Sequence, residues 1–300
     1  MEIAEDIEKW KKKRNAVILA HNYQLPEVQD IADYVGDSLG LSIQAAKTEA
    51  DVIVFCGVHF MAETAKILSP AKTVLLPDEK AGCPMADMIT AEDIRQLKAE
   101  HPGAAALCYV NTSAAVKAEC DLCCTSANAV RMVEEVLKDE KEIIFVPDRY
   151  LAAYVASQTA GELIPWQGFC PTHARILPEN IAEMKALHPD AELLVHPECA
   201  PELTALADRV ASTEGMCRYA KESGSMEFIV ATERGILHRM EKENPGKRFY
   251  PASRFAVCPN MKYTTADKIL RALQDLVYEI EVPENIAFRA RRSIERMLIQ

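Results

Sequence analysis

The chain has 300 residues, of which 49% are hydrophobic and 26% are charged, and its formal net charge is −11. This length allows one large domain or two to three small ones, and the charge argues against a nucleic-acid partner or an anionic membrane surface. No apolar run approaches the roughly 20 residues of a membrane span, and the first six residues lack the basic flank and apolar core of a signal peptide. We therefore expect a cytoplasmic protein.

The chain repeats itself at intervals of 87 or 88 residues. Ala4-Glu5-Asp6-Ile7 recurs as Ala91-Glu92-Asp93-Ile94, and shorter matches follow at Glu179 and Ala266. A repeat of this kind predicts similar structural units that stack on one another. The predicted units span 1–88, 89–175 and 176–262, and a C-terminal helical tail follows at 263–300.

Each unit is expected to open with an amphipathic helix and then to alternate short apolar strands with helices. The first strands are predicted at 16–20, 104–108 and 192–195, and the third strands at 52–56, 143–146 and 228–231. Continuous apolar strands between helices indicate parallel sheets that are covered on both faces. The predicted fold class is α/β, with three homologous three-layer αβα units in a pseudo-threefold arrangement and the active site on the central axis.

Three of the ten cysteines recur in register. Cys83, Cys170 and Cys258 each precede a proline near the end of a unit, and no other cysteine recurs in all three units. Under pseudo-threefold symmetry these positions converge on the axis, where three thiolates suit a [4Fe–4S] cluster with one open iron. Such an iron acts as a Lewis acid on a substrate oxygen. Zinc on three thiolates and three buried structural cysteines are the alternatives.

A second group of cysteines has the look of a metal or redox motif. Cys120, Cys123 and Cys124 lie close together in the chain, but the other two units have no counterpart of this run. The run falls on the predicted second strand of the second unit, where buried thiols are common. We therefore expect these cysteines to be core residues and not ligands.

Polar residues follow the first strand of each unit, where parallel α/β sheets bind ligands. The three triplets are His21-Asn22-Tyr23, Tyr109-Val110-Asn111 and His196-Pro197-Glu198. Any one of them can be an ordinary polar strand end, but a set built for packing alone has little use for these side chains. We predict that the triplets line a site for a small molecule.

Hydroxyl residues also recur after the second strands. Ser38, Ser126 and Thr213 occupy equivalent positions, each before a predicted helix. Helix capping alone explains such residues, but helix N-termini also bind anions. Three such ends around one axis would accept a molecule with up to three anionic groups. His173 has no histidine counterpart in the other units and is a candidate acid–base or phosphate contact.

Taken together, these motifs resemble the quinolinate synthase A family of NAD biosynthesis over nearly the whole chain. The segments that carry the resemblance are Ala20-His21-Asn22-Tyr23-Gln24, Gly36-Asp37-Ser38-Leu39, Tyr109-Val110-Asn111-Thr112, Gly168-Phe169-Cys170-Pro171-Thr172-His173, His196-Pro197-Glu198-Cys199 and Cys258-Pro259-Asn260-Met261-Lys262. The resemblance implies three α/β domains around one [4Fe–4S] cluster with a non-cysteine fourth site. It also implies condensation of iminoaspartate with dihydroxyacetone phosphate to quinolinate, phosphate and water, and functional coupling to an enzyme that oxidises aspartate.

The resemblance suggests roles for the predicted site residues. Glu198 is the candidate general base, and Tyr23 and Tyr109 are candidate proton carriers or orienting groups. The predicted substrate contacts are His21, Ser38, Tyr109, Val110, Asn111, Ser126, His196, Pro197, Glu198 and Thr213. Because the net reaction transfers no electrons, the cluster would act as a Lewis acid.

Two other classes of protein stay open at this point. An iron–sulfur redox sensor needs an output module, and none is visible in the sequence. A non-catalytic binder of small molecules has no need for the tyrosines and Glu198. Turnover with dihydroxyacetone phosphate separates an enzyme from both.

Overall fold

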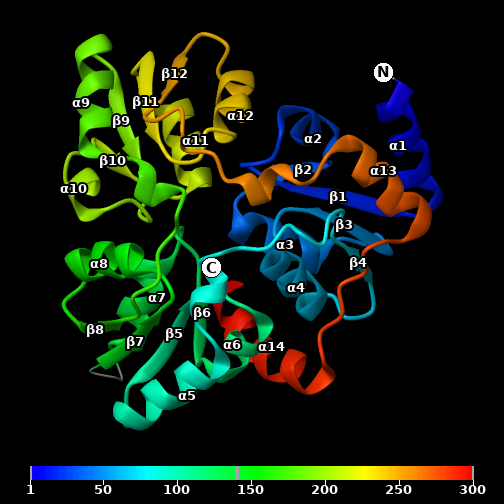
Figure 1. The fold of residues 1–300 in the computed structure, drawn as a ribbon, viewed down its shortest axis with the longest axis horizontal. Coiled ribbons are helices and arrows are strands. Elements are labelled where there is room, and N and C mark those ends of the chain that lie inside the picture. Colours follow the sequence, from blue (N-terminus) through cyan, green and yellow to red (C-terminus); the bar gives the residue numbers. More distant parts are fainter. Residues whose placement is uncertain (1, 139–141, 299–300) are drawn as a thin grey trace.

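The computed structural model describes residues 2–138 and 142–298, which contain three parallel sheets of four strands each. Helices cover both faces of each sheet, and the three units stand around a common centre (Figure 1). The predicted α/β class and the three αβα units in a threefold-like arrangement are therefore confirmed.

The first unit sets the pattern that the others repeat. Its elements are α1 (Glu2–Lys13), β1 (Ala16–His21), α2 (Pro26–Ile31), β2 (Tyr34–Gly36), α3 (Ser38–Lys47), β3 (Val52–Cys56), α4 (His59–Leu68), β4 (Thr73–Leu75) and the 3-10 turn η1 (Ala86–Met88). The strand order is β2-β1-β3-β4. The chain thus leaves β1 on one side and returns on the other, so that β1 and β3 flank a topological switch point. Ligands of open α/β sheets bind at the carboxyl ends of such strands.

The second unit has the same order, with the sheet β6-β5-β7-β8. Its elements are α5 (Ala91–Glu100), β5 (Ala105–Tyr109), α6 (Ala114–Glu119), β6 (Leu122–Cys124), α7 (Ala129–Val136), β7 (Glu142–Val146), α8 (Arg149–Gln158), β8 (Glu162–Pro165) and η2 (His173–Arg175). The switch point here lies between β5 and β7.

The third unit repeats the order once more, as β10-β9-β11-β12. Its elements are α9 (Pro178–Leu187), β9 (Glu192–Val195), α10 (Pro201–Thr204), β10 (Arg209–Val210), α11 (Thr213–Glu222), β11 (Glu227–Ala231), α12 (Ile236–Glu243), β12 (Arg248–Pro251) and η3 (Pro259–Lys262). The predicted first and third strands of all three units are confirmed, with each end within one residue of the prediction.

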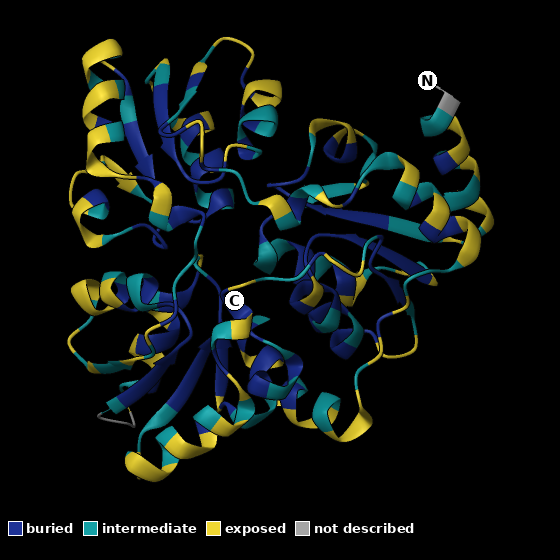
Figure 2. Ribbon diagram, viewed as in Figure 1, coloured by how far each residue is buried: buried dark blue, intermediate teal, exposed yellow. Residues whose placement is uncertain are grey.

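Burial explains why the central strands lack polar alternation. Every residue of β3 is buried, because helices cover both faces of the sheet, and its sequence runs Val-Ile-Val-Phe-Cys. The edge strand β8 is partly exposed along its length. Figure 2 shows the same contrast across the molecule, with buried strands inside and exposed faces on the outer helices.

The two helices of the C-terminal tail pack on the first two units. α13 (Ala266–Asp275) lies against α1, where Ile269 and Leu273 share a buried cluster with Ile7. α14 (Glu284–Leu298) packs on α6 and β6, and the Ser293 hydroxyl donates to the Lys117 carbonyl at 3.0 Å. Neither these helices nor any other helix in the described part of the chain is long and apolar enough to cross a membrane.

Candidate active site

A cavity lies where the three units meet, and each unit contributes its Cys-Pro cysteine to the wall. The sequence-predicted residues that line the cavity are His21, Tyr23, Ser38, Cys83, Tyr109, Asn111, Ser126, Cys170, His173, His196, Glu198, Thr213 and Cys258. Residues far apart in the sequence therefore meet in one place. Such convergence is what the register of the three units predicted.

Two of the predicted substrate contacts lie outside this lining. Val110 belongs to the hydrophobic core, and its N–H donates to the Cys124 carbonyl at 2.8 Å. Pro197 lines a separate groove that also includes Tyr154 and Arg209. Both are the middle residue of their triplet, and side chains along an extended segment alternate in direction. Their neighbours on either side face the cavity instead.

The three Cys-Pro cysteines share one local structure. Each is followed by a 3-10 turn, η1, η2 or η3, whose backbone N–H groups point back at the sulfur. Burial raises the pKa of the Cys83, Cys170 and Cys258 thiols, and the proximity of Cys258 adds to the shift at Cys83. Three converging sulfurs that each accept backbone hydrogen bonds are a donor set that fits an iron–sulfur cluster.

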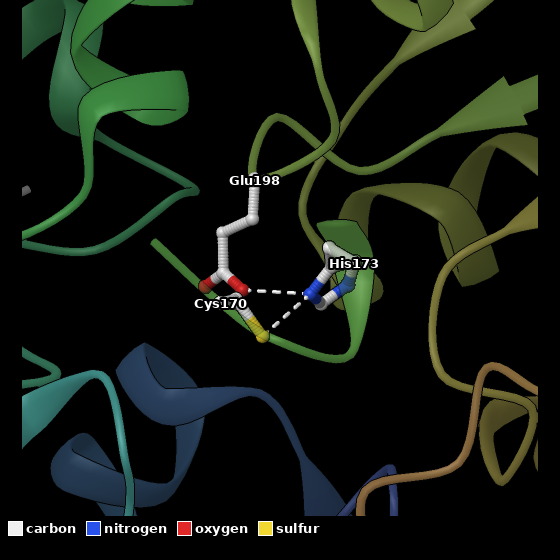
Figure 3. Close-up of side chains that lie close together, drawn as sticks. All are labelled: Cys170, His173 and Glu198. Carbon is white, nitrogen blue, oxygen red and sulfur yellow. Dashed lines mark hydrogen bonds and ion pairs between the residues drawn. The ribbon is translucent and has the colours of Figure 1, made fainter. Parts of the chain in front are cut away.

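A smaller donor group overlaps with the three thiols. Figure 3 shows one ring nitrogen of His173 in contact with both Cys170 and Glu198, and the candidate ligand atoms of these three residues all lie within 4.8 Å of one another. Sulfur, imidazole and carboxylate are also zinc ligands. The two donor sets share Cys170 only, which makes them distinguishable by substitution.

The cysteine run of the second unit lies in the core. Cys123 and Cys124 end strand β6 and are fully buried, and the Cys123 sulfur lies 3.1 Å from the Cys108 sulfur on the neighbouring strand. Cys120 is buried just before the same strand. These cysteines are not among the residues that line the cavity.

The predicted caps of the three helices need correction. Asp37 caps α3 and Ser212 caps α11, so Ser38 and Thr213 occupy the first helical turn and do not cap. In the second unit, α7 begins only after Asn128, whose side-chain oxygen accepts the Thr125 N–H at 2.7 Å. The capping explanation for Ser38, Ser126 and Thr213 is therefore wrong. Their side chains line the cavity instead.

His21 and His196 have the same environment in the first and third units. The His21 Nδ1 accepts the Tyr23 N–H at 3.2 Å, and the His196 Nδ1 accepts the Glu198 N–H at 3.3 Å. Burial lowers the pKa of both imidazoles to about 3. Each ring is therefore neutral at pH 7 with its proton on Nε2, and can donate one hydrogen bond to an anion in the cavity.

Glu198 is the centre of the polar network in the cavity. Its Oε1 accepts the Tyr109 hydroxyl at 2.5 Å, and its Oε2 lies 2.8 Å from the His173 Nδ1. Burial opposes the charge, but the His173 interaction, with His196 and Tyr109, outweighs it and holds the pKa of Glu198 well below its usual range. The carboxylate is thus ionised and held by a donor on each oxygen.

The two tyrosines remain neutral donors. Burial, followed by the charge of Glu198, raises the pKa of both Tyr23 and Tyr109 well above the usual range. Their hydroxyl groups can orient an oxygen or pass a proton, but they do not ionise at neutral pH.

Sequence reasoning missed part of the lining. Glu233, which is fully buried, lines the cavity, pairs with Lys262 at 3.0 Å and accepts the Cys258 N–H at 3.2 Å. An apolar wall of Val58, Phe60 and Met61 was also not predicted. Glu233 and Val58 follow the third strands of their units. The switch-point rule applies to third strands as well as first strands, so that signal was present in the sequence.

Comparisons with known proteins agree with the geometry. A family model described as quinolinate synthetase A protein matches residues 5–299. The chain is 54% identical over 297 residues to the quinolinate synthase of Methanosarcina barkeri, covering 99% of this chain and 97% of the relative. It is 55% identical over 296 residues to that of Dehalococcoides mccartyi, with 99% and 97% covered. It is 57% identical over 297 residues to that of Desulforudis audaxviator, with 99% and 98% covered.

The buried imidazoles predict how stability depends on pH. The pKa of His196 is about 3 in the folded protein against 6.5 for the unperturbed side chain, so between these values only the unfolded chain binds the proton. The free energy of unfolding of the metal-free protein should therefore fall from pH 7 to pH 5, by roughly 1 to 2 kcal/mol for each such imidazole.

Urea unfolding of His196→Asn at the two pH values tests this prediction. The asparagine oxygen can still accept the Glu198 N–H, while the titrating ring is gone. The variant should lose less stability than the wild type between pH 7 and pH 5. An identical loss in both proteins would contradict the prediction.

Proposed function

The chain belongs to the quinolinate synthetase A family, and from this premise we propose that it is a quinolinate synthase of NAD biosynthesis. The proposed reaction condenses iminoaspartate with dihydroxyacetone phosphate to give quinolinate, phosphate and water. The observation that carries the proposal is the single cavity in which a cysteine from each unit meets buried acid–base groups. A cavity of this kind combines metal donors with proton donors and acceptors.

The proposed cofactor is a [4Fe–4S] cluster held by Cys83, Cys170 and Cys258. Their sulfurs accept backbone hydrogen bonds, which suits this group, since hydrogen bonds to sulfur set the reduction potential of a cluster. When bound, the cluster would supply a Lewis-acidic iron without a protein thiolate. Glu198 and His173 lie beside Cys170 and face the same space.

Both proposed substrates are anions, and the cavity offers three kinds of anion contact. The neutral rings of His21 and His196 present Nε2–H donors. The first turns of α3 and α11 present Ser38 and Thr213 together with helix N-termini. Asn111 and Ser126 add polar side chains from the second unit. These groups would hold two carboxylates and a phosphate, since no lysine or arginine is among the described residues that line the cavity.

Proton transfer is assigned to the network around Glu198. Carbon–carbon bond formation, phosphate loss, ring closure and dehydration each require a proton to be taken or given. Glu198 is ionised and can accept a proton, while Tyr109 and Tyr23 are neutral and can donate. His173, on the other side of Glu198, completes the set of groups that can move a proton at one point in the cavity.

The proposed substrates place the protein beside another class of enzyme. Iminoaspartate is the product of aspartate oxidation and is unstable in water, so we propose functional coupling to an enzyme that oxidises aspartate. We also propose a cytoplasmic location, as expected from the sequence.

Serine substitutions test the proposed ligands. Replacing Cys83, Cys170 or Cys258 by Ser should each remove the cluster from anaerobically prepared protein, measured as iron and sulfide, because a serine hydroxyl is a poor substitute for a thiolate. The matched controls Cys120→Ser, Cys123→Ser and Cys124→Ser should keep it. Metal retained in the Cys83 and Cys258 variants, but lost from the Cys170 variant, would instead indicate zinc on Cys170, His173 and Glu198.

Substitution of Glu198 tests the proposed reaction. Wild-type protein should form quinolinate from iminoaspartate and dihydroxyacetone phosphate, and Glu198→Gln should do so at least about a hundredfold more slowly, because an amide cannot accept the proton. The exposed Glu202→Gln is the matched control and should turn over normally. Near-normal turnover in Glu198→Gln with the cluster intact would rule out the base role and direct attention to Tyr23 and Tyr109.

A further inference from the structure

We propose that Thr232 is a positioning residue, which holds Tyr23 of the first unit and His173 of the second unit in register with Glu198. Thr232 directly follows β11 in the third unit, and its side chain is buried. It is not among the residues that line the cavity, so it acts on the substrate only through its neighbours. The inference rests on the proposed function.

The Thr232 hydroxyl lies between two groups of the cavity. Its oxygen is 2.6 Å from the Tyr23 hydroxyl and 2.8 Å from the His173 Nε2. The direct distance from the Tyr23 hydroxyl to the same nitrogen is longer, at 3.4 Å. The best-formed connection between the phenol and the imidazole therefore runs through Thr232.

The direction of these hydrogen bonds follows from their surroundings. The Tyr23 phenol is neutral and has one proton to donate, and Thr232 can accept it. The Thr232 hydroxyl can then donate to the His173 Nε2, which leaves a proton on the His173 Nδ1. That nitrogen faces the ionised Glu198 oxygen at 2.8 Å, where a hydrogen-bond donor is required. The opposite tautomer would bring two acceptors together.

The result is one continuous chain of hydrogen bonds from Tyr23 to Tyr109. It passes through Thr232, His173 and Glu198, and ends at the Tyr109 hydroxyl, 2.5 Å from Glu198. Every donor in the chain meets an acceptor. Thr232 is the only link contributed by a residue outside the lining of the cavity.

Comparison within the molecule argues against a purely structural role. The backbone N–H groups of His59, Arg149 and Arg234 each donate to the carbonyl two residues before their unit's Cys-Pro cysteine. The residues two positions before these donors are Gly57, Pro147 and Thr232. The same turn therefore forms without a side-chain hydroxyl in two of the three units. The hydroxyl occurs where Tyr23 and His173 need a partner.

Valine is the sharpest substitution for Thr232. It keeps the branched shape but removes both hydrogen bonds, so Tyr23 and His173 lose their common partner. Thr232→Val should lower kcat at least about tenfold while KM stays within about threefold, because the substrate contacts remain and the orientation of the proton-moving groups is lost. Thr232→Ser restores the hydroxyl and should recover most of the loss.

Two further comparisons separate positioning from folding. Thr264 is a matched control, since it is fully buried and its hydroxyl has no hydrogen-bond partner among the described residues. Thr264→Val should keep kcat, and all variants should keep their iron content and remain folded at the assay temperature. If Thr232→Val does not fold, Thr232→Ala gives the same comparison, because alanine and serine differ by the oxygen alone.

A double substitution tests whether Thr232 acts through Tyr23. In a Tyr23→Phe background, Thr232→Val should lower kcat by a clearly smaller factor than in the wild type, since the hydrogen bond to Tyr23 is already absent and only the one to His173 is lost. Full additivity, wild-type kcat in Thr232→Val, or equal losses in Thr232→Ser and Thr232→Val would each overturn the inference. If the wild type forms no quinolinate, the proposed function is contradicted as well. If the wild type is active and one of these results is obtained, only the inference about Thr232 is contradicted.

Discussion

The structure depends on one constraint, which is that three Cys-Pro turns from three units must reach the same cavity. Each turn comes after the last strand of its unit, so the carboxyl ends of all three sheets have to point inward. Contacts between units fix two of the turns. Asn260 donates to the Gly82 carbonyl at 2.8 Å, joining the turns of Cys83 and Cys258. Lys262 joins Glu233 to the backbone of Tyr23 in the same region.

Two of the proposed acid–base groups in the cavity depart from the threefold pattern. The cysteines recur in every unit, but His173 lies on the second turn only, where the other units have Ala86 and Met261. Glu198 likewise occurs in the third unit alone. The donors of the proposed cluster therefore recur in all three units, while the proposed proton-transfer groups Glu198 and His173 each occur in one unit. The proposed cluster ligands and the proposed proton-transfer groups lie close together, since His173 contacts both Glu198 and Cys170.

Much of this arrangement could be predicted from the sequence, and the failures have physical reasons. Buried parallel strands carry unbroken apolar runs, so the strands were predictable. The repeat brought Cys83 into register with its two counterparts, so their meeting in one cavity was predictable as well. The capping role of Ser38 was wrong because a cap lies one residue before the helix, where Asp37 stands. The role of Thr232 could not be predicted, because its position after a third strand places it near the cavity but does not identify its partners, which are distant in sequence.

The central claim is that the three units together hold one iron–sulfur cluster in the shared cavity. Iron and acid-labile sulfide analysis of wild-type protein, purified without oxygen, tests it most directly. We expect about four irons and four sulfides for each chain. One zinc for each chain without sulfide, or no metal at all, would contradict it.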